Sequence, residues 1–444
     1  MSRSHRCLVV EGLPYHWELL PPWVAMLQEL GHEVEVAAVG GITGHQETLD
    51  LLQSRCRTHQ TADVRTLPLA DFDFVVLNSL VHEGYFFSEP LDQRPNLKWV
   101  QDLGRPSISI VHEPVYWVEK RIAHSFSEVG DQGRGVLNLL SDGGFQREMG
   151  FWSQECWSME GNRLRLPGEG RTRIFESSDG GHSYCGLDAD RATMLLRRDV
   201  PAEDLSRHCA DGRHAVIAMT ERAAAHLASV CDGVEWILPF EIRDRLPERL
   251  TGETAFAGII DYDRKAIHSL VKGAEALRGD GYIRMIGGSR NTAEFLDSGF
   301  IRYFKEQIGK RGLDPRFRFT GYLPYGEFVD KIRTCRFLLP LVDDYVDGGS
   351  YTLKLPAAVP YALGLGVPLV VNRAVAERFD LQYMVCYPDD DLASGLQAMQ
   401  KLSARDYAAM LETLDRHAEA LYRRNIGVLA GLIERITGQG GGVG

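Results

Sequence analysis

Short apolar runs alternate with amphipathic segments along most of the chain. In the first half, Arg6–Val10, Phe72–Leu77, Ser107–Val111 and Ala215–Met219 have the pattern of buried strands, and His32–Val39 alternates before it turns apolar. Segments of helical pattern lie between these runs, as from Pro22 to Leu30. Strands that alternate with helices in this way are typical of a doubly wound parallel sheet.

A second series of the same kind fills the second half. It predicts strands at Ala255–Ile260, Tyr282–Ile286, Phe317–Tyr322, Phe337–Pro340, Leu369–Val371 and Tyr383–Tyr387. The charged, proline-bearing segment Pro239–Gly252 separates the two series and is interpreted as a linker. We therefore expect an α/β protein with two Rossmann-like domains that face a cleft, at residues 1–240 and 252–403. Helices over 404–437 are expected to cross back to the first domain, and 438–444 is expected to be a disordered glycine-rich tail.

The α/β pattern stops at about residues 135–211. Arg163–Leu166 and Arg171–Phe175 alternate around a Gly-rich turn, which predicts a β-hairpin in a β-rich insert. The following Ser177–Tyr184 resembles an Asp-box, the turn motif of sialidase propellers. One copy cannot build a propeller, so the insert is interpreted either as a self-capped surface hairpin or as a flap that shapes an acceptor site with exposed aromatic residues. The aromatic candidates for the flap are Phe151, Trp152 and Trp157.

The composition of the chain argues against several classes of function. The chain has 444 residues, enough for two ordinary cores, and a formal net charge of −12, which argues against a nucleic-acid partner. Eight cysteines without a CxxC motif indicate ordinary reduced thiols. No run of eighteen apolar residues predicts a transmembrane segment, and we expect a cytoplasmic protein.

The most informative stretch runs from Cys335 to Asn372. An apolar strand is followed by an acidic, Gly-rich loop, a helix predicted over Leu353–Leu365, Gly366 just past its end, and a second apolar strand. The loop lies at the carboxyl end of its strand, where open α/β sheets bind ligands. A helix start beside Lys354 suits a phosphate or diphosphate.

This order, with its Gly-Gly-Ser loop, Leu-Lys-Leu and Ala-Leu-Gly-Leu-Gly-Val-Pro-Leu-Val-Val, resembles the sugar-nucleotide-binding half of GT-B glycosyltransferases. The closest type is the group with a glycogen-synthase-like C-terminal domain (glycosyltransferase family 4-like). Leu353 and Tyr361 stand where that group usually carries two glutamates, and Ile259 stands at its first basic position. The resemblance implies donor-binding residues at Gly258, Arg264, Lys265, Gly287, Gly288, Gly321, Tyr322, Leu323, Gly348, Gly349, Ser350, Tyr351 and Lys354.

The first domain supplies the candidates for catalysis. His112 and Glu113 follow a strand end, where similar enzymes present a histidine to the donor sugar. His16, in the loop after the first strand with Glu11, is the alternative general base. Gly12, Asn78 and Trp152 are the candidates for acceptor binding.

Together these patterns predict a glycosyltransferase that moves a sugar from a nucleotide-diphosphate sugar to an acceptor hydroxyl, with retention favoured over inversion. The acceptor is a carbohydrate, small molecule or peptide. No cofactor beyond the donor is expected. No metal is expected either, because no Asp-x-Asp ends a strand in the first half. The alternatives are a non-catalytic GT-B carbohydrate-binding or scaffold protein, favoured by the missing glutamates, and a nucleotide-sugar 2-epimerase.

Overall fold

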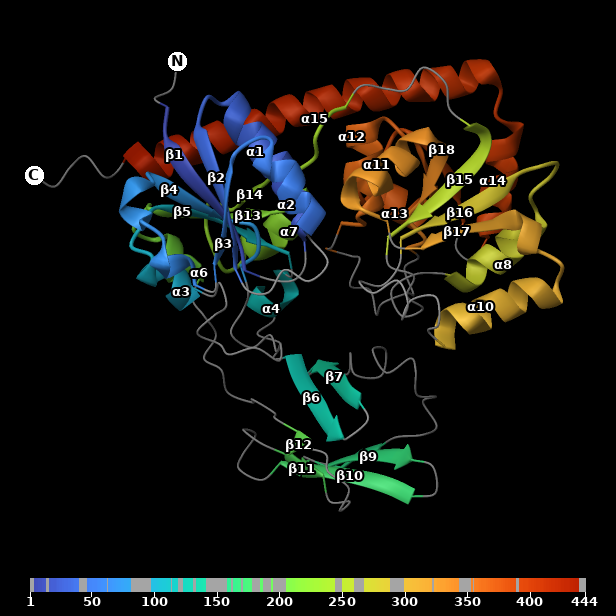
Figure 1. Cartoon of the computed structure of the whole chain (residues 1–444), viewed down its shortest axis with the longest axis horizontal. Coiled ribbons are helices and arrows are strands. Elements are labelled where there is room, and N and C mark those ends of the chain that lie inside the picture. Colours follow the sequence, from blue (N-terminus) through green and yellow to red (C-terminus); the bar gives the residue numbers. More distant parts are fainter. Residues whose placement is uncertain are drawn as a thin grey trace, which may run out of the picture.

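The computed structural model contains two parallel sheets, each packed between helices, and a separate group of antiparallel strands (Figure 1). The structure describes residues 4–12, 16–39, 46–61, 63–80, 97–112, 114–118, 123–130, 133–140, 158–160, 163–168, 171–177, 184–186, 193–194, 205–243, 250–258, 267–287, 299–321, 323–342, 353, 355–388 and 391–438. The predicted α/β class with two Rossmann-like domains is confirmed.

The first sheet has seven parallel strands in the order β14-β13-β5-β4-β1-β2-β3. Its strands are β1 (Arg6–Glu11), β2 (Glu33–Val39), β3 (Arg57–Thr61), β4 (Phe74–Leu77), β5 (Ser107–Val111), β13 (His214–Ala218) and β14 (Glu235–Trp236). The helices of this domain are α1 (Leu20–Glu29), α2 (Gln46–Gln53), α3 (Leu97–Asp102), α4 (Pro114–Val118), α6 (Leu205–Cys209) and α7 (Glu221–Leu227). The chain winds outward in one direction from β1 to β3 and then returns to β4, so the switch point of the sheet lies between β1 and β4.

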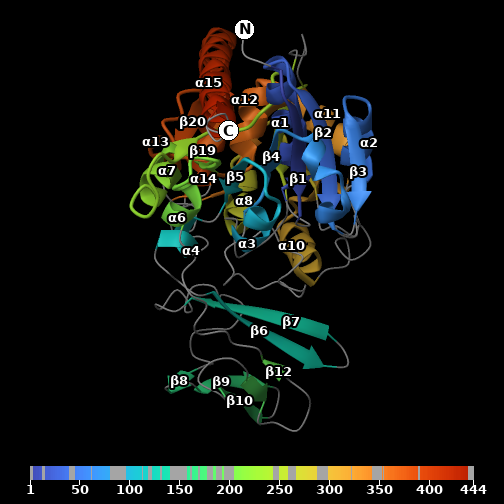
Figure 2. The ribbon, with the colours of Figure 1, turned by 90° about the vertical axis from the view of Figure 1, so that its left-hand side faces the viewer.

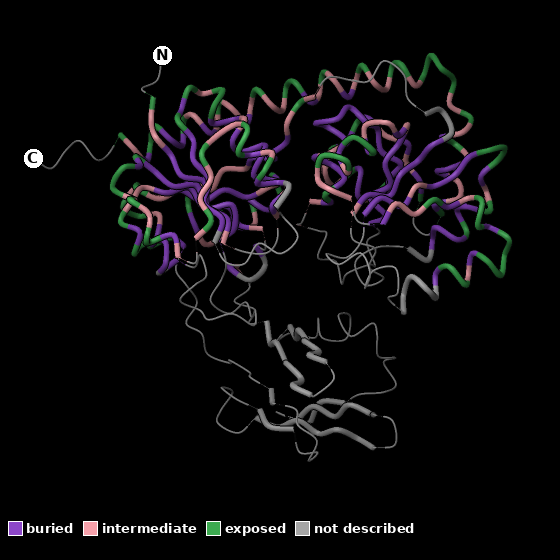
Figure 3. The backbone as a smooth tube through the Cα atoms, in the orientation of Figure 1, coloured by how far each residue is buried: buried purple, intermediate pink, exposed green. Residues whose placement is uncertain are grey.

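Strand β1 shows why the apolar runs form central strands. Cys7 and Val9 enter the core on one face of the sheet, and Leu8 and Val10 enter the core on the other. A strand covered on both faces needs apolar residues at every position, which the sequence supplies. Figure 3 shows the resulting buried interior of each domain in purple.

The second sheet has six parallel strands in the order β17-β16-β15-β18-β19-β20. Its strands are β15 (Leu250–Ala257), β16 (Tyr282–Ile286), β17 (Phe317–Gly321), β18 (Cys335–Leu339), β19 (Leu369–Asn372) and β20 (Met384–Tyr387). Its helices are α8 (Ile267–Glu275), α10 (Gly299–Lys310), α11 (Tyr325–Thr334), α12 (Ala358–Leu365), α13 (Arg373–Arg378) and α14 (Leu392–Lys401). The same winding places its switch point between β15 and β18.

One long helix, α15 (Ala404–Gly438), joins the two domains along one side of the molecule (Figure 1). Leu414 and Ala418 lie in the core of the second domain, whereas Leu429 and Leu432 lie in the core of the first. Between them, the buried Asn425 donates through Nδ2 to Leu238 O at 2.6 Å. The helix therefore packs against both sheets and is fixed to the segment that connects them.

The antiparallel strands lie on the side of the molecule opposite α15 (Figures 1 and 2). They are β6 (Ala123–Gly130), β7 (Gly133–Leu140), β8 (Ser158–Glu160), β9 (Arg163–Gly168), β10 (Arg171–Ser177), β11 (Tyr184–Gly186) and β12 (Thr193–Met194). The predicted hairpin is the antiparallel pair β9–β10, in which Arg171 faces Gly168. The Asp-box-like residues 178–183 lie outside the described residues.

Three boundaries differ from the predicted ones. The β-rich region begins at Ala123 rather than at residue 135, because β6 pairs with β7 and carries the antiparallel pattern upstream. It also ends before residue 211, since α6 starts at Leu205 and packs beside β13. Strand β15 starts at Leu250, inside the predicted linker.

Gly364 marks a close approach between the connecting segment and α12. A Cβ atom on Gly364 would overlap the carbonyl oxygen of Glu241, and Arg243 N donates to Gly364 O at 2.9 Å. Both partners are backbone, so neither can rotate away. We expect Gly364→Ala to lower the free energy of unfolding by about 1–3 kcal/mol, the usual cost of overpacking.

Gly427→Ala is the matched control for this substitution. Gly427 is an exposed helical residue of α15, and a Cβ atom added to it would have no neighbour within 4 Å among the described residues. Without a clash, the higher helix propensity of alanine should raise stability by about 0.5–1 kcal/mol. Thermal and urea unfolding should show a lower free energy of unfolding for Gly364→Ala and a higher one for Gly427→Ala. If both variants gained stability equally, the segment at Glu241 would not pack on α12 as described.

The buried His208 should make the folded protein less stable in mild acid. Its ring is buried, stacks on His214 at 4.4 Å, and has no hydrogen-bond partner among the described residues. Burial, aided by the charge of His214, lowers the pKa of His208 to about 4. Between pH 6.5 and 4 the unfolded chain therefore binds a proton that the folded chain does not, so stability falls as pH falls, by about 3 kcal/mol in total. Urea unfolding at pH 7.5 and 5 should show this slope in the native protein and a smaller one in His208→Leu.

Candidate active site

A group of buried polar side chains lies where β1 and β4 end, at the switch point of the first sheet. Glu11 is the last residue of β1, and Asn78 and Ser79 directly follow β4; all three are at most 2% exposed. Asn78 Nδ2 donates to Glu11 Oε2, and Ser79 Oγ donates to the same oxygen at 3.2 Å. Parallel neighbours end at the same edge of a sheet, which is why residues 67 positions apart meet here.

Two histidines complete this group. The rings of His16 and His112 are stacked, with centroids 3.9 Å apart and planes 1° from parallel. His112 follows β5, and its Nε2 lies 2.6 Å from the carbonyl oxygen of Asn78. His16 belongs to the loop after β1, and its Nδ1 lies 3.8 Å from a carboxylate oxygen of Glu18. The sequence proposed His16 and His112 as alternative catalysts; the structure places them in contact.

The bond to Asn78 fixes the tautomer of His112. A carbonyl oxygen can only accept a hydrogen bond, so Nε2 of His112 must carry a proton. In the neutral ring, Nδ1 is then the basic nitrogen. The arrangement can therefore accept a proton at His112 Nδ1, which is the chemistry of a general base.

The second sheet presents glycines at the carboxyl ends of neighbouring strands. Gly258 follows β15 with a φ of 125°, and Gly287 follows β16 with a φ of 112°. A Cβ on Gly287 would lie 2.6 Å from Gly258 O, so the two backbones approach as only glycine permits. Gly321 ends β17 with a φ of 69°, and Leu323 lies two residues further along the chain. These four predicted donor-binding residues lie at the end of the sheet where ligands bind in such folds.

The two domains touch beside these groups. Thr220, just after β13, donates to Leu353 O at 3.3 Å, next to Lys354 in the sequence. Tyr325, the first residue of α11, donates to the carbonyl oxygen of Glu18 at 3.4 Å. The segment that carries His16 is thus in contact with the second domain.

The helix after β18 begins later than predicted. It starts at Ala358, not at Leu353, because Pro356 disfavours the helical conformation of the residue before it. The helix ends at Leu365, as predicted, and Gly366 follows it in the left-handed conformation with a φ of 63°. Tyr361, at the position of one missing glutamate, packs against the ring of Phe328 in the second core.

The remaining predicted site residues are not described by the structure, except Gly12, and their roles stay predictions. Gly12 directly follows β1. The predicted residues outside the described ranges are Glu113, Trp152, Arg264, Lys265, Gly288, Tyr322, Gly348, Gly349, Ser350, Tyr351 and Lys354.

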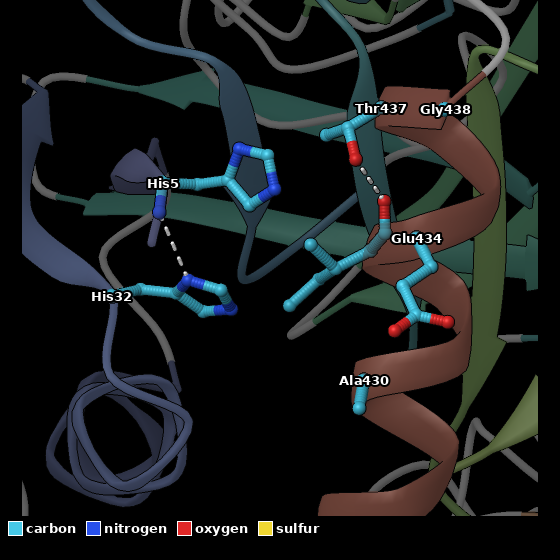
Figure 4. Close-up of a pocket in the computed structure, with 7 residues that line it drawn as sticks. His5, His32, Ala430, Glu434, Thr437 and Gly438 are labelled. Atoms are coloured by element: carbon cyan, nitrogen blue, oxygen red, sulfur yellow. Dashed lines mark hydrogen bonds between the residues drawn. The ribbon is translucent and has the colours of Figure 1, made fainter. Parts of the chain in front are cut away.

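A separate cavity of about 350 Å³ lies at the opposite end of the first sheet (Figure 4). His5 and His32 line one side of it and Glu434 of α15 lines the other. His5 precedes the amino end of β1, whereas the stacked histidines lie beyond the carboxyl ends of the strands. The cavity therefore takes no part in the polar group described above.

The described part of the chain shows neither a metal site nor a membrane span. Within the described ranges, no three His, Cys, Asp or Glu residues are arranged to hold a metal ion. No helix in those ranges has the length and apolar character needed to cross a bilayer.

Similar folds occur among solved structures. No protein-family model matches the chain, and no curated protein matches its sequence. The crystal structure of Anabaena HepE with UDP and glucose is similar, with a TM-score of 0.53 and 12% identity over 96% of this chain and 99% of that one. A glycosyltransferase from Rickettsia africae gives a TM-score of 0.53 and 10% identity over 98% and 100%. The chain has the two-domain GT-B fold that the sequence resemblance predicted.

Proposed function

We propose that this protein transfers a sugar from a nucleotide-diphosphate sugar to an acceptor hydroxyl. The observation that carries the proposal is the stacked pair His16–His112, held beside a buried carboxylate at the switch point of the first sheet. Such a group supplies a base where open α/β sheets bind ligands. The similar HepE structures contain UDP with glucose or UDP-glucose, which supports this donor class.

In this proposal the two domains bind different substrates. The donor binds to the second domain, where Gly258 and Gly287 let backbone N–H groups approach a diphosphate. Arg264, Lys265 and Lys354 neutralise the leaving diphosphate. The acceptor binds to the first domain, between the histidine pair and the donor.

The reaction breaks the bond between the anomeric carbon and the diphosphate and forms a bond to the acceptor oxygen. The acceptor hydroxyl loses its proton, which neutral His112 accepts at Nδ1. The resemblance of the second domain to glycogen-synthase-like domains favours retention of the anomeric configuration, whereas a single displacement assisted by a base on the acceptor favours inversion; the anomeric configuration of the product distinguishes the two.

A non-catalytic sugar-nucleotide-binding protein is the second candidate. It is favoured by Leu353 and Tyr361 at the glutamate positions, since the ring of Tyr361 packs in the core against Phe328. Both candidates bind a nucleotide sugar, but only the first consumes it.

Two measurements test the proposal. Thermal unfolding with a panel of nucleoside diphosphates should show stabilisation by one of them, about 2.7 kcal/mol at 100-fold its dissociation constant. Lys354→Ala should remove that shift. Slow hydrolysis of the matching nucleotide sugar without acceptor then separates enzyme from binding protein. The absence of a shift with every nucleotide would contradict both candidates.

A further inference from the structure

Asn78 bonds to both histidines of the stacked pair. Its side-chain amide donates to the carbonyl oxygen of His16 at 2.9 Å, and its own carbonyl oxygen accepts from His112 Nε2 at 2.6 Å. We infer that Asn78 is a positioning residue that sets the histidine pair, with Glu11 as its anchor. The effect of Asn78 on turnover rests on the proposed function, whereas its effect on the position of the histidines does not.

The orientation of the Asn78 amide follows from its partners. Nδ2 faces a carboxylate oxygen of Glu11 and the carbonyl oxygen of His16, which both accept. The reverse orientation would place Oδ1 against two acceptors. Asn78 is fully buried, so bulk water cannot replace the hydrogen-bond partners of its amide.

His16 needs such support because of its backbone. Its φ of 63° and ψ of 18° lie in the left-handed region, which costs a non-glycine residue about 1–2 kcal/mol. The carbonyl oxygen of His16 is the atom that Asn78 Nδ2 holds, and it also accepts from Leu19 N at 3.0 Å. The strained conformation directs the His16 ring onto His112, so the Asn78 bond maintains the stack.

The two histidines depend on different parts of Asn78. His16 is held by the side chain, whereas His112 is held by the main chain, which is itself fixed because Asn78 N donates to Val10 O at 2.9 Å. Removing the side chain should therefore release His16 and leave His112 in place. A residue that merely filled space would disturb both.

The first experiment measures the geometry without turnover. In Asn78→Ala, nitrogen-detected NMR of the imidazoles should show His112 still protonated at Nε2 and the His16 resonances moved. Ser109→Ala is the matched control, because Ser109 is equally buried on neighbouring β5 and its Oγ has no hydrogen-bond partner among the described residues. Unchanged His16 resonances in Asn78→Ala would overturn the inference, whatever the activity of the protein.

The second experiment is a double-mutant cycle on turnover of the nucleotide sugar. Asn78→Ala should lower kcat about 100-fold with little change in KM for the donor, as expected for a displaced catalytic group. Added to His16→Ala or to His112→Ala it should have little further effect, because a displaced His16 acts on turnover only through its stacked partner His112. Equal, independent losses in both backgrounds would contradict a role through His16.

Asn78→Asp adds a pH signature. It sets two carboxyl groups against each other, and such a pair binds one proton more tightly than a lone carboxyl group does. The protonated pair restores one donor, so the activity of this variant relative to the native protein should rise as pH falls. A constant ratio across pH would count against the anchor role of Glu11. If no nucleotide sugar is consumed by the native protein, the proposed function fails while the NMR result still decides the positioning role.

Discussion

Truncating the chain after Arg424 will unfold the first domain. The truncation removes Leu429, Leu432, Ile433 and Ile436, which are at most 3% exposed and belong to the core on one face of the first sheet. Burying each such side chain stabilises a fold by about 1.5–3 kcal/mol, so the four together contribute about 6–12 kcal/mol. That equals most or all of the stability of an ordinary domain.

Thermal unfolding and limited proteolysis of the truncated chain measure this effect. The first domain should lose its protection, whereas the second domain keeps Leu414 and Ala418 and should remain resistant. Truncation after Gly438 is the control, because it leaves every residue of α15 in place. A truncated chain with an intact first domain would show that α15 is an accessory to that domain and not part of its core.

The apolar pattern predicted the central strands well but missed the polar edge strand β3 of the first sheet. Strand β16 has the bounds that the sequence predicted, since a strand buried on both faces must be almost wholly apolar. Strand β3 reads Arg-Thr-His-Gln-Thr, lies at the edge of the sheet, and is partly exposed throughout. It is held by pairing with β2, and a polar edge strand leaves no apolar signal.

Proline explains the error at α12. The apolar pattern continues back to Leu353, so periodicity alone extends the helix to that point. Pro356 stops it, whereas Pro360 is tolerated because the first-turn N–H groups have no partner within the helix. Pro356 therefore lies before the helix and Pro360 lies in its first turn. The apolar pattern alone does not show at which residue the helix starts, so it does not distinguish these two roles.

The candidate site could be predicted only in part from the sequence. Strand ends pointed to His112 and Asn78, and the loop after the first strand pointed to His16. Their contact depends on the order of β1, β4 and β5 in the sheet and on the left-handed backbone of His16, which no local pattern specifies. Ser79 was missed, because a serine after a strand is ordinary until its neighbour in space is a buried carboxylate.

The loss of His112 should have the largest effect on turnover. General-base catalysis contributes about 10²–10⁴-fold, and the Asn78 carbonyl presets the tautomer of His112, so we expect His112→Ala to lower kcat by a factor in that range. Stabilisation by the nucleoside diphosphate should persist, because the proposed donor site lies on the second domain. A proton bound at Nδ1 would remove the ability of His112 to act as a base, so turnover should fall in acid. His417→Ala is the control, since this histidine packs on Tyr383 in the second domain. Equal turnover in His112→Ala and the native protein would assign the base elsewhere.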